Sequence, residues 1–252
     1  MPRYRLAITP LSRAAGWILG AGLLQCSLAH AQGIELDPAK WPLSSVGRVN
    51  VITGAGRRSQ CTGTLIGPRH VLTAAHCLFN APRTLWVHPT SVHFVAGYAR
   101  GEYKAHSQAV SYERGPAFVH SAPPRLAAIA DDWAVIRLAE AIDLKPIRVR
   151  MGGDAVALTD VVRAGYRGDR AHVLTVQKDC ASSTIPAEGV SLLRTCSSVV
   201  GESGSALLHV AGDEPEIIGI LSASTTGSSL AVPSSTFAAA VQRALEPSVA
   251  PR

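Results

Sequence analysis

The sequence has few charged and aromatic residues and no long apolar run. Charged residues make up 17% and aromatic residues 5% of the 252 positions, whereas 47% are hydrophobic, a balance that excludes a disordered chain. No apolar stretch approaches the ~20 residues that span a bilayer, which excludes a membrane protein with several spans. Heptads and repeats of roughly 20–50 residues are also absent, which excludes coiled coils and solenoids.

Turn residues are abundant, and they separate short apolar segments. The 22 glycines and 16 prolines favour short strands over a helical bundle. Alternating, β-branched or continuously apolar residues predict strands at 46–53, 60–66, 70–74, 92–96, 133–138, 160–166, 172–177, 205–210, 216–222 and 230–233. Only 236–245 has helical spacing. Two sets of antiparallel strands followed by one helix predict an all-β fold of paired barrels.

The first thirty-one residues have the three parts of a secretory signal. Three arginines precede an apolar stretch at 14–24, and the small residues Ala29 and Ala31 follow it. We therefore expect residues 1–31 to be a signal peptide that is removed on export. A buried N-terminal helix and a lipoprotein signal ending at Cys26 are the alternatives.

The remaining chain is predicted to form two domains. A segment rich in turn and charged residues at 143–154 separates the two sets of strands. The N-terminal β-barrel is expected to occupy 32–148, and the C-terminal β-barrel with its helix is expected to occupy 149–252.

Loss of the signal would also lower the net charge. It removes three of the 24 lysines and arginines and none of the 18 acidic residues, so the formal charge falls from +6 to +3. No basic run or stripe with interleaved aromatics is present, so we expect no nucleic-acid partner. Arg57, Arg58 and the scattered arginines are predicted to be solvated surface. We expect a monomer with no membrane association after signal cleavage.

Four cysteines remain after export, in two pairs. Cys61 and Cys77 are 16 residues apart, as are Cys180 and Cys196. Three connectivities are formally possible, but local pairing within each cluster is the simplest for an exported protein. A zinc site is the competing interpretation. It is poorly supported because Cys-x-x-Cys and His-x-x-x-His spacings are absent, so we expect no metal and no cofactor.

Two segments carry a base and an acid that could work together. In LTAAHC a predicted strand leads into His76 beside Cys77, and the small alanines let other backbone come close. In DDWAVIRL a carboxylate stands at the mouth of an apolar strand, where it can be buried against an imidazole and orient it. Asp132 is the preferred carboxylate, and Asp131 is its rival.

A third segment carries a candidate nucleophile. Ser203 lies between Gly201-Glu202 and Gly204-Ser205. Glycine neighbours allow unusual φ values, and they leave backbone N–H groups free to face an oxyanion. The segment therefore suits a serine held in a sharp turn.

In the order His76, Asp132, Ser203, these segments resemble the trypsin/chymotrypsin-like serine endopeptidases, above all their bacterial secreted branch. The resemblance covers residues 46–245 and implies the chymotrypsin-like double barrel, two antiparallel six-stranded β-barrels with a C-terminal helix. The Cys61–Cys77 spacing also matches the cystine around the histidine in that family. A GxSxG segment alone would also fit an α/β-hydrolase, but there the acid and the histidine follow the serine.

The resemblance implies a role for each of these residues. His76 would be the general base, Asp132 would orient it, and Ser203 would be the nucleophile. The backbone N–H groups of Gly201 and Ser203 would form the oxyanion hole. The implied reaction is hydrolysis of a protein or peptide substrate through an acyl-enzyme, without a cofactor.

The specificity residues follow from the same alignment. Ser197, six residues before the nucleophile, stands at the expected base of the primary pocket. Ser222, Ala223 and Ser224 occupy the places of the segment that pairs with substrate backbone. Because Ser197 is uncharged and Leu221 replaces a histidine, neither cleavage after Lys/Arg nor glutamyl specificity is implied. We expect small or medium neutral side chains to be preferred.

One residue departs from the family pattern. Glu202 replaces the aspartate that usually precedes the nucleophile, and the chain lacks an arginine followed by Ile-Val-Gly-Gly. Activation by a new N-terminal ammonium is therefore unsupported, and Glu202 is expected to make a different contact. A weak or inactive protease-fold binding protein is the alternative function. An exported esterase or lipase is disfavoured by the β-rich sequence after Ser203.

Overall fold

The computed structural model describes most of the chain beyond its N-terminal segment. The described residues are 37, 39–54, 57–121, 125–152, 158–187, 190–210 and 214–246. All of them belong to one compact unit, Gly33–Arg252. The predicted signal peptide at 1–31, which includes Cys26, lies outside the described residues.

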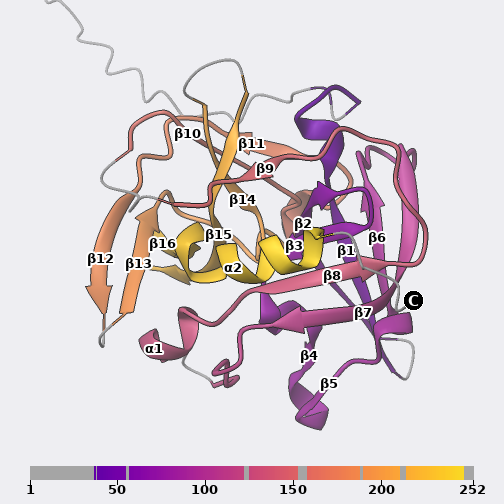
Figure 1. The fold of residues 1–252 in the computed structure, drawn as a ribbon, viewed down its shortest axis with the longest axis horizontal. Helices are drawn as coiled ribbons and strands as arrows, with labels where there is room; N and C mark the ends of the chain where they lie inside the picture. The colour runs from indigo at the N-terminus through magenta and orange to yellow at the C-terminus, as the bar shows by residue number, and fades with distance from the viewer. Residues whose placement is uncertain are drawn as a thin grey trace, which may run out of the picture. The chain divides into compact units, whose positions relative to one another are not determined.

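Six strands of the first half form a closed antiparallel barrel (Figure 1). They are β1 (Val46–Gly54), β2 (Arg57–Gly67), β3 (His70–Thr73), β6 (Val92–Ala96), β7 (Ala105–Arg114) and β8 (Ala134–Leu138), in the order β1-β2-β3-β8-β7-β6. Burial along β6 alternates residue by residue, as expected for a strand with one face toward a core. Phe94, Leu65 and Ile136 fill the interior of the barrel.

Short elements connect these strands. They are the 3₁₀ turns η1 (Leu43–Ser45), η2 (Ala75–Leu78), η3 (Ala81–Arg83) and η4 (Pro89–Ser91), the hairpin of β4 (Phe79–Asn80) and β5 (Leu85–Trp86), and the helix α1 (Leu126–Ile129). The turn η2 follows β3 directly, and α1 ends just before β8, so both flank strand ends of the barrel.

The second half forms an eight-stranded sheet. Its strands are β9 (Arg148–Val149), β10 (Val161–Gly165), β11 (Thr175–Gln177), β12 (Ser183–Ala187), β13 (Val190–Thr195), β14 (Ala206–His209), β15 (Glu216–Thr225) and β16 (Ser228–Pro233). The order is β11-β10-β14-β15-β16-β13-β12, and β9 pairs with β15. Leu158 and Ser182 form an antiparallel bridge with two N–H···O bonds of 2.9 Å. This bridge joins the segment before β10 to the segment before β12, so a ring of six strands closes.

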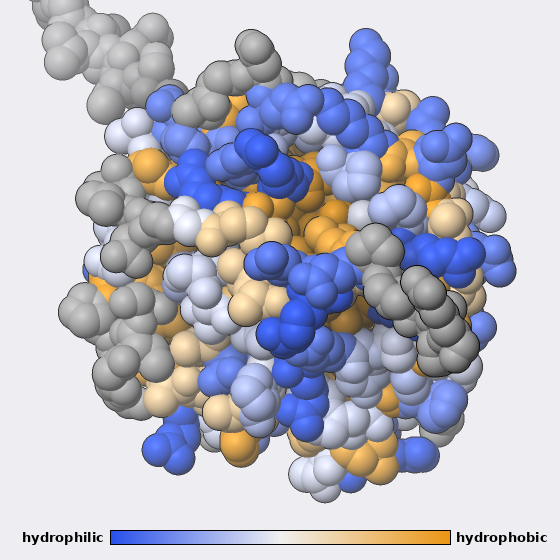
Figure 2. All heavy atoms as spheres, viewed as in Figure 1, coloured by the Kyte–Doolittle hydropathy of each residue, from blue (hydrophilic) through white to orange (hydrophobic). Residues whose placement is uncertain are grey.

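The helix α2 (Ser234–Leu245) ends the described chain and is amphipathic. Phe237 and Val241 are fully buried, whereas Gln242 and Arg243 are exposed. Figure 2 shows hydrophilic side chains over this part of the surface. The rings of Phe237 and Trp133 lie 6.4 Å apart, and both belong to one apolar cluster that includes residues of the barrel and of the sheet. The two halves therefore share a core.

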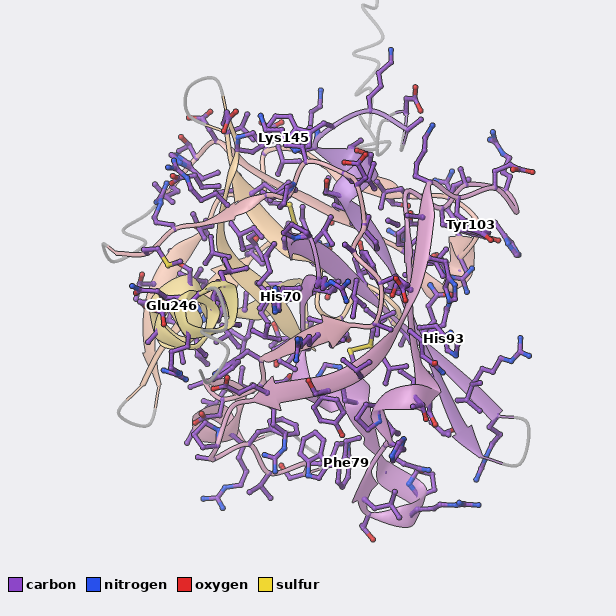
Figure 3. All side chains as sticks on the ribbon, turned by 45° about the vertical axis from the view of Figure 1, so that its right-hand side comes forward. His70, Phe79, His93, Tyr103, Lys145 and Glu246 are labelled. Atoms are coloured by element: carbon purple, nitrogen blue, oxygen red, sulfur yellow. A yellow bond between two sulfur atoms is a disulfide. The ribbon has the colours of Figure 1, made fainter. Side chains whose placement is uncertain are left out.

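Two disulfides link the cysteine pairs, and Figure 3 draws them as yellow bonds. Cys61 is bonded to Cys77, which ties β2 to η2, and Cys180 is bonded to Cys196, which ties the segment before β12 to the residue after β13. Among the described residues, no helix combines the length and the apolar character needed to cross a membrane.

The predicted all-β architecture is confirmed, but three long strands were missed. They are β7, β12 and β13. Valine and tyrosine are the only large hydrophobic residues in the sequence of β7, AHSQAVSYER, so its alternation is too weakly apolar to stand out. Its pairing with β6 and β8 on either side supplies the stability that its side chains lack.

Candidate active site

His76 lies in the turn η2, at the end of β3. Ala74 and Ala75 before it are fully buried, which lets the turn pack closely against the barrel. The disulfide between Cys77 and Cys61 restrains the turn from its other side. The imidazole itself remains 28% exposed, so it faces a space that a substrate can enter.

Asp132 meets His76 with both of its carboxylate oxygens. Its Oδ1 accepts the backbone N–H of His76 at 2.8 Å, and its Oδ2 lies 2.7 Å from the His76 Nδ1. The hydroxyl of Ser222 donates a further hydrogen bond to Oδ2. An ionised carboxylate can only accept, so Nδ1 carries a proton and Nε2 is the free nitrogen of the neutral ring.

This arrangement raises the pKa of His76. Burial of the ring by itself would lower the pKa, but the negative charge of Asp132 and its hydrogen bond outweigh burial, and the net pKa lies above its usual value. Asp132 is only 2% exposed, so water screens the pair weakly. Among the described residues, Asp131, the alternative carboxylate, makes no hydrogen bond or ion pair with the imidazole.

Ser203 lies in a turn whose glycines cannot be replaced without strain. Gly201 has φ +94° and Gly204 has φ +79°, values that favour glycine. A Cβ on Gly201 would lie 2.6 Å from the Tyr166 carbonyl oxygen, and one on Gly204 would lie 2.3 Å from the Thr62 carbonyl oxygen. The turn therefore depends on both positions, as the glycine neighbours in the sequence suggested.

The carbonyl groups on either side of Gly201 are held in place. The Val200 carbonyl accepts the Gly168 N–H at 2.6 Å, and the Gly201 carbonyl accepts the Thr62 hydroxyl at 3.0 Å. In a planar trans peptide the N–H points opposite to the carbonyl. The Gly201 N–H is thus turned away from Gly168.

The peptide before Ser203 is held in the same way. The Glu202 carbonyl accepts the Ser205 N–H at 2.9 Å, and the Ser203 carbonyl accepts the Thr62 N–H at 2.9 Å. Among the described residues, no acceptor bonds to the N–H of Gly201 or of Ser203. Two donors beside the serine hydroxyl are therefore available to a bound oxygen.

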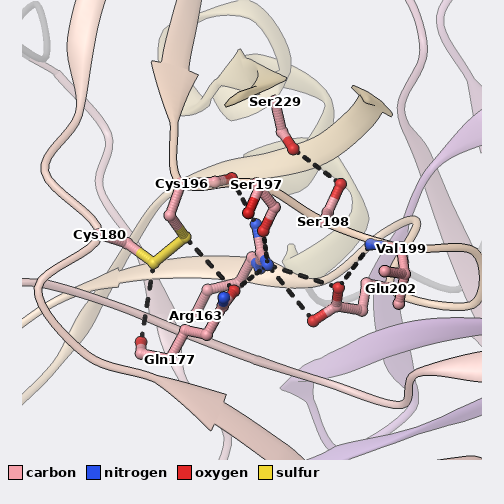
Figure 4. Close-up of a disulfide and its surroundings, with 9 residues drawn as sticks. All are labelled: Arg163, Gln177, Cys180, Cys196, Ser197, Ser198, Val199, Glu202 and Ser229. Atoms are coloured by element: carbon pink, nitrogen blue, oxygen red, sulfur yellow. Dashed lines mark hydrogen bonds and ion pairs between the residues drawn. A yellow bond between two sulfur atoms is a disulfide. The ribbon is translucent and has the colours of Figure 1, made fainter. Parts of the chain in front are cut away.

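A buried ion pair lies directly behind the turn (Figure 4). The Arg163 Nη2 is 3.3 and 3.4 Å from the two carboxylate oxygens of Glu202, and both side chains are at most 1% exposed. Arg163 also donates to the carbonyls of Cys196 and Ser197 and to the side chain of Gln177. Burial lowers the pKa of Arg163, and the charge of Glu202 opposes this. Glu202 thus has its counterion within the chain, in Arg163.

Arg163 was not expected to be buried. The scattered arginines were predicted to be solvated surface, which is correct for Arg57 and Arg58 and wrong for Arg163. Its place inside the otherwise apolar strand VVRAG is the signal that could have revealed it, since a charge there needs a buried partner. Thr62 was missed for a different reason, because a threonine in a strand has no distinctive pattern.

The expected triad residues line one cavity of about 290 Å³. His76, Asp132 and Ser203 lie on its wall, together with Ser222, Ala223 and Ser224 among others. Both halves of the fold therefore contribute to one cleft.

Ser197 is not among the lining residues of this cleft, whereas Ser198 is. The Ser198 hydroxyl lies 2.7 Å from the hydroxyls of both Ser224 and Ser229. Ser198 and Ser224 thus place uncharged hydroxyl groups on the wall of the cleft, and the role of Ser197 at the base of the primary pocket stays a prediction.

The described residues bring three potential metal ligands together in one place only. They are Cys61, His76 and Cys77, but the two sulfurs form a disulfide and are not available to an ion.

Comparison with known proteins agrees with this geometry. The family model described as Trypsin matches residues 41–246. The chain belongs to the trypsin family. It is a serine-type endopeptidase, a hydrolase of peptide bonds.

Solved structures support the same fold for this protease at low sequence identity. A Glu endopeptidase is 20% identical with a TM-score of 0.63, and the alignment covers 84% of this chain and 94% of that one. The VesB protease of Vibrio cholerae is 20% identical with a TM-score of 0.62, covering 85% and 67%. The protease Anisep of Arthrobacter nicotinovorans is 16% identical with a TM-score of 0.62, covering 79% and 96%. No curated protein matches the sequence.

Proposed function

We propose that Ser203, His76 and Asp132 form the catalytic triad of this endopeptidase. The three side chains share one cavity, and Asp132 holds the imidazole by Nδ1, which leaves Nε2 to take the proton of the Ser203 hydroxyl. The order and roles match those of the trypsin-family triad.

The reaction proceeds in two halves. Ser203 Oγ attacks the carbonyl carbon of the substrate while its proton passes to His76 Nε2, and the buried carboxylate of Asp132 stabilises the imidazolium. The tetrahedral intermediate collapses as His76 returns the proton to the leaving amine, which leaves an acyl group on Ser203. Water then attacks the acyl-enzyme with His76 again as the base, and the acid product leaves.

The N–H groups of Gly201 and Ser203 are the proposed oxyanion hole. This is the observation that carries the proposal: the carbonyls around them are held by Gly168, Thr62 and Ser205, so both donors are free and fixed before substrate arrives. Donors that need no reorganisation stabilise the developing charge most effectively, and one such donor contributes about 3–4 kcal/mol.

The buried ion pair argues against the alternative of an inactive binding protein. That alternative rested on Glu202, whose larger side chain could distort the turn. Arg163 accommodates the carboxylate at 3.3 Å, and the Glu202 Oε2 also accepts the Val199 N–H at 2.8 Å. The turn thus has an internal counterion, and an N-terminal ammonium is not required to order it.

The preferred side chain at the cleavage site is proposed to be small or medium and uncharged. The Ser198 hydroxyl bonds to the hydroxyls of Ser224 and Ser229, and none of the three offers a charge to a Lys, Arg or Glu side chain. We further propose that the enzyme is exported, since two disulfides are typical of proteins in oxidising compartments. We also propose that it acts as a monomer.

A fluorophosphonate probe tests the triad, because it reacts only with an activated serine. The oxidised protein should incorporate one equivalent of the probe on Ser203, and Ser203→Ala should incorporate none while its melting temperature stays close to that of the parent. Ser205→Ala, two residues away, is the matched control and should still be labelled. Failure to label the folded parent protein would favour the binding-protein alternative.

A further inference from the structure

A second groove, outside the cleft, crosses the outer face of the first barrel. Its volume is about 640 Å³, and it shares no lining residue with the cleft. The polar side chains that line it come from β1, β2, β6 and β7 and include Arg48, Asn50, Arg58, Gln60, His93 and His106. Figure 3 labels His93 on this side of the barrel.

The groove is basic, and it has no carboxylate among its lining residues. Arg48 lies 4.7 Å from the centre of the Tyr98 ring and donates only to the Ala171 carbonyl, at 3.4 Å. Its Nε is buried without a hydrogen-bond partner. Within the described part of the chain, no ion pair involves Arg48 or Arg58. Unpaired guanidinium groups in a groove attract an anion.

Some arginines elsewhere on the surface are paired within the chain. Arg148 and Arg150 both bond to Glu216, and Arg243 bonds to Glu113. The groove instead brings two arginines together with no carboxylate in its lining, which leaves positive charge there for a partner outside the chain.

Two histidines add to the recognition surface. The His93 Nδ1 lies 3.0 Å from the His106 Nε2, and the rings are stacked with an interplanar angle of 11°. Such a pair can also bind a divalent cation, but the arginines of the same groove repel one. The imidazole N–H groups suit a carboxylate better.

The strand β2 connects this groove to the proposed nucleophile. Thr62 on β2 donates its N–H to the carbonyl of Ser203, and Gln60 and Arg58 follow two and four residues away on the same strand. Arg48 on β1 is the cross-strand partner of Thr62, and a strand advances about 3.3 Å per residue, so the groove runs from beside Thr62 to Arg58, about 13 Å along β2. The segment Ser222–Ser224 lies in the other cavity, where we expect the acyl part of the substrate.

We propose that this groove binds acidic side chains of the protein substrate on the carboxyl-terminal side of the scissile bond. The inference rests on the proposed function, because it uses Ser203 as the point of cleavage. Carboxylates of an extended substrate would reach Arg48 first and Arg58 next, and arginine can hold a carboxylate by two parallel hydrogen bonds.

Peptide cleavage tests the proposal directly. Three fluorogenic peptides share one cleavable core and carry two glutamates after the scissile bond, two glutamates before it, or glutamines at all four places. At low salt the parent enzyme should show about tenfold higher kcat/KM for the first peptide than for the neutral one, a gain that shrinks with added salt. The double variant Arg48→Gln/Arg58→Gln should reduce this gain to less than about twofold while cleaving the neutral peptide normally.

Arg137→Gln is the matched control, because it removes the same charge from an exposed position on β8 outside the groove and should keep the gain. The proposal is overturned if the parent enzyme shows no gain, if glutamates before the bond produce the same gain, or if the double variant keeps it. Cleavage of the neutral peptide reports on the triad separately.

Binding provides the second readout if no peptide is cut. Fluorescence anisotropy with the Ser203→Ala protein should then show tighter binding of the first peptide than of the neutral one. Equal binding of the two peptides would overturn the proposal that the groove binds acidic side chains.

Discussion

The two halves of the fold hold their functional side chains in different ways. His76 and Asp132 stand next to the ends of β3 and β8, strands that are paired along their whole length, and they contact each other directly. Ser203 lies on the loop between β13 and β14, where the chain makes no ladder pairing. The loop is held by Thr62 from the barrel and by a buried ion pair. The proposed base is thus fixed by regular structure and the proposed nucleophile by tertiary contacts.

This difference suggests where each half is vulnerable. Changes at His76 or Asp132 should remove chemistry and leave the fold intact, because the barrel is stabilised by its own core. Changes behind Ser203 should affect both activity and stability, since the same contacts that shape the loop also satisfy buried polar groups.

The largest effect is expected from Asp132→Asn. An amide can donate a hydrogen bond to Nδ1 and so select the wrong tautomer of His76, and kcat should fall by ~10⁴-fold. Stopped-flow acylation with an ester substrate measures this loss. Ser222→Ala removes only the hydroxyl that bonds to Asp132 and should cost about tenfold. A loss below tenfold for Asp132→Asn would contradict the assigned role.

Arg163→Met is expected to have the next largest effect. It leaves the carboxylate of Glu202 buried without its counterion, and the free energy of unfolding should fall by about 3–5 kcal/mol. Activity should fall with it. Urea unfolding measures the first effect and peptide hydrolysis the second. Arg243→Met breaks an exposed pair with Glu113 and should change stability by less than about 1 kcal/mol. If Arg163→Met and Arg243→Met lowered the free energy of unfolding equally, the buried pair would not hold the Ser203 loop more strongly than a surface pair does. The contrast between the two halves of the fold would then be removed.

Thr62→Val should have a smaller effect on both catalysis and stability, because it leaves the buried Tyr166 N–H without its acceptor. Valine has nearly the same shape but cannot donate to the Gly201 carbonyl or accept the Tyr166 N–H, so kcat should fall by about 10–100-fold with KM little changed. Thr62→Ser keeps the hydroxyl and should remain close to the parent. A serine variant as impaired as the valine variant would point to packing instead.

The pH dependence is the mildest test. The pKa of His76 is raised in the folded protein, so its charged form stabilises the fold at pH values below about 6.5, its unfolded pKa. That contribution is lost as pH rises through the higher folded pKa, while activity rises over the same range because the base must be neutral. In Asp132→Asn only burial acts on the pKa of His76, and burial lowers it. The acid limb of the activity profile should therefore move to lower pH. If the acid limb of Asp132→Asn lay at the same pH as that of the parent enzyme, this would contradict the pairing of Asp132 with His76.

The local sequence motifs identified the residues of the cleft, but not the residues that hold them in place. TAAHC and GESGS are contiguous in sequence, and each was recognisable from its residue types alone. Arg163 and Glu202 are 39 residues apart and meet only after β10 packs behind the loop. The cleft also has Ser198 on its wall, a residue that the sequence did not single out, because the direction of a side chain in an irregular loop follows from the contacts of that loop.

What the sequence determined by itself is the chemistry: an imidazole, a carboxylate and a serine between glycines, in a chain rich in short strands and paired cysteines. Only the tertiary structure decided that Glu202 has a counterion, that the N–H groups of Gly201 and Ser203 have no acceptor among the described residues, and that Arg48 and Arg58 share a groove with two histidines. Residue types are local properties, whereas burial, pairing and free hydrogen-bonding groups depend on which distant segments come into contact.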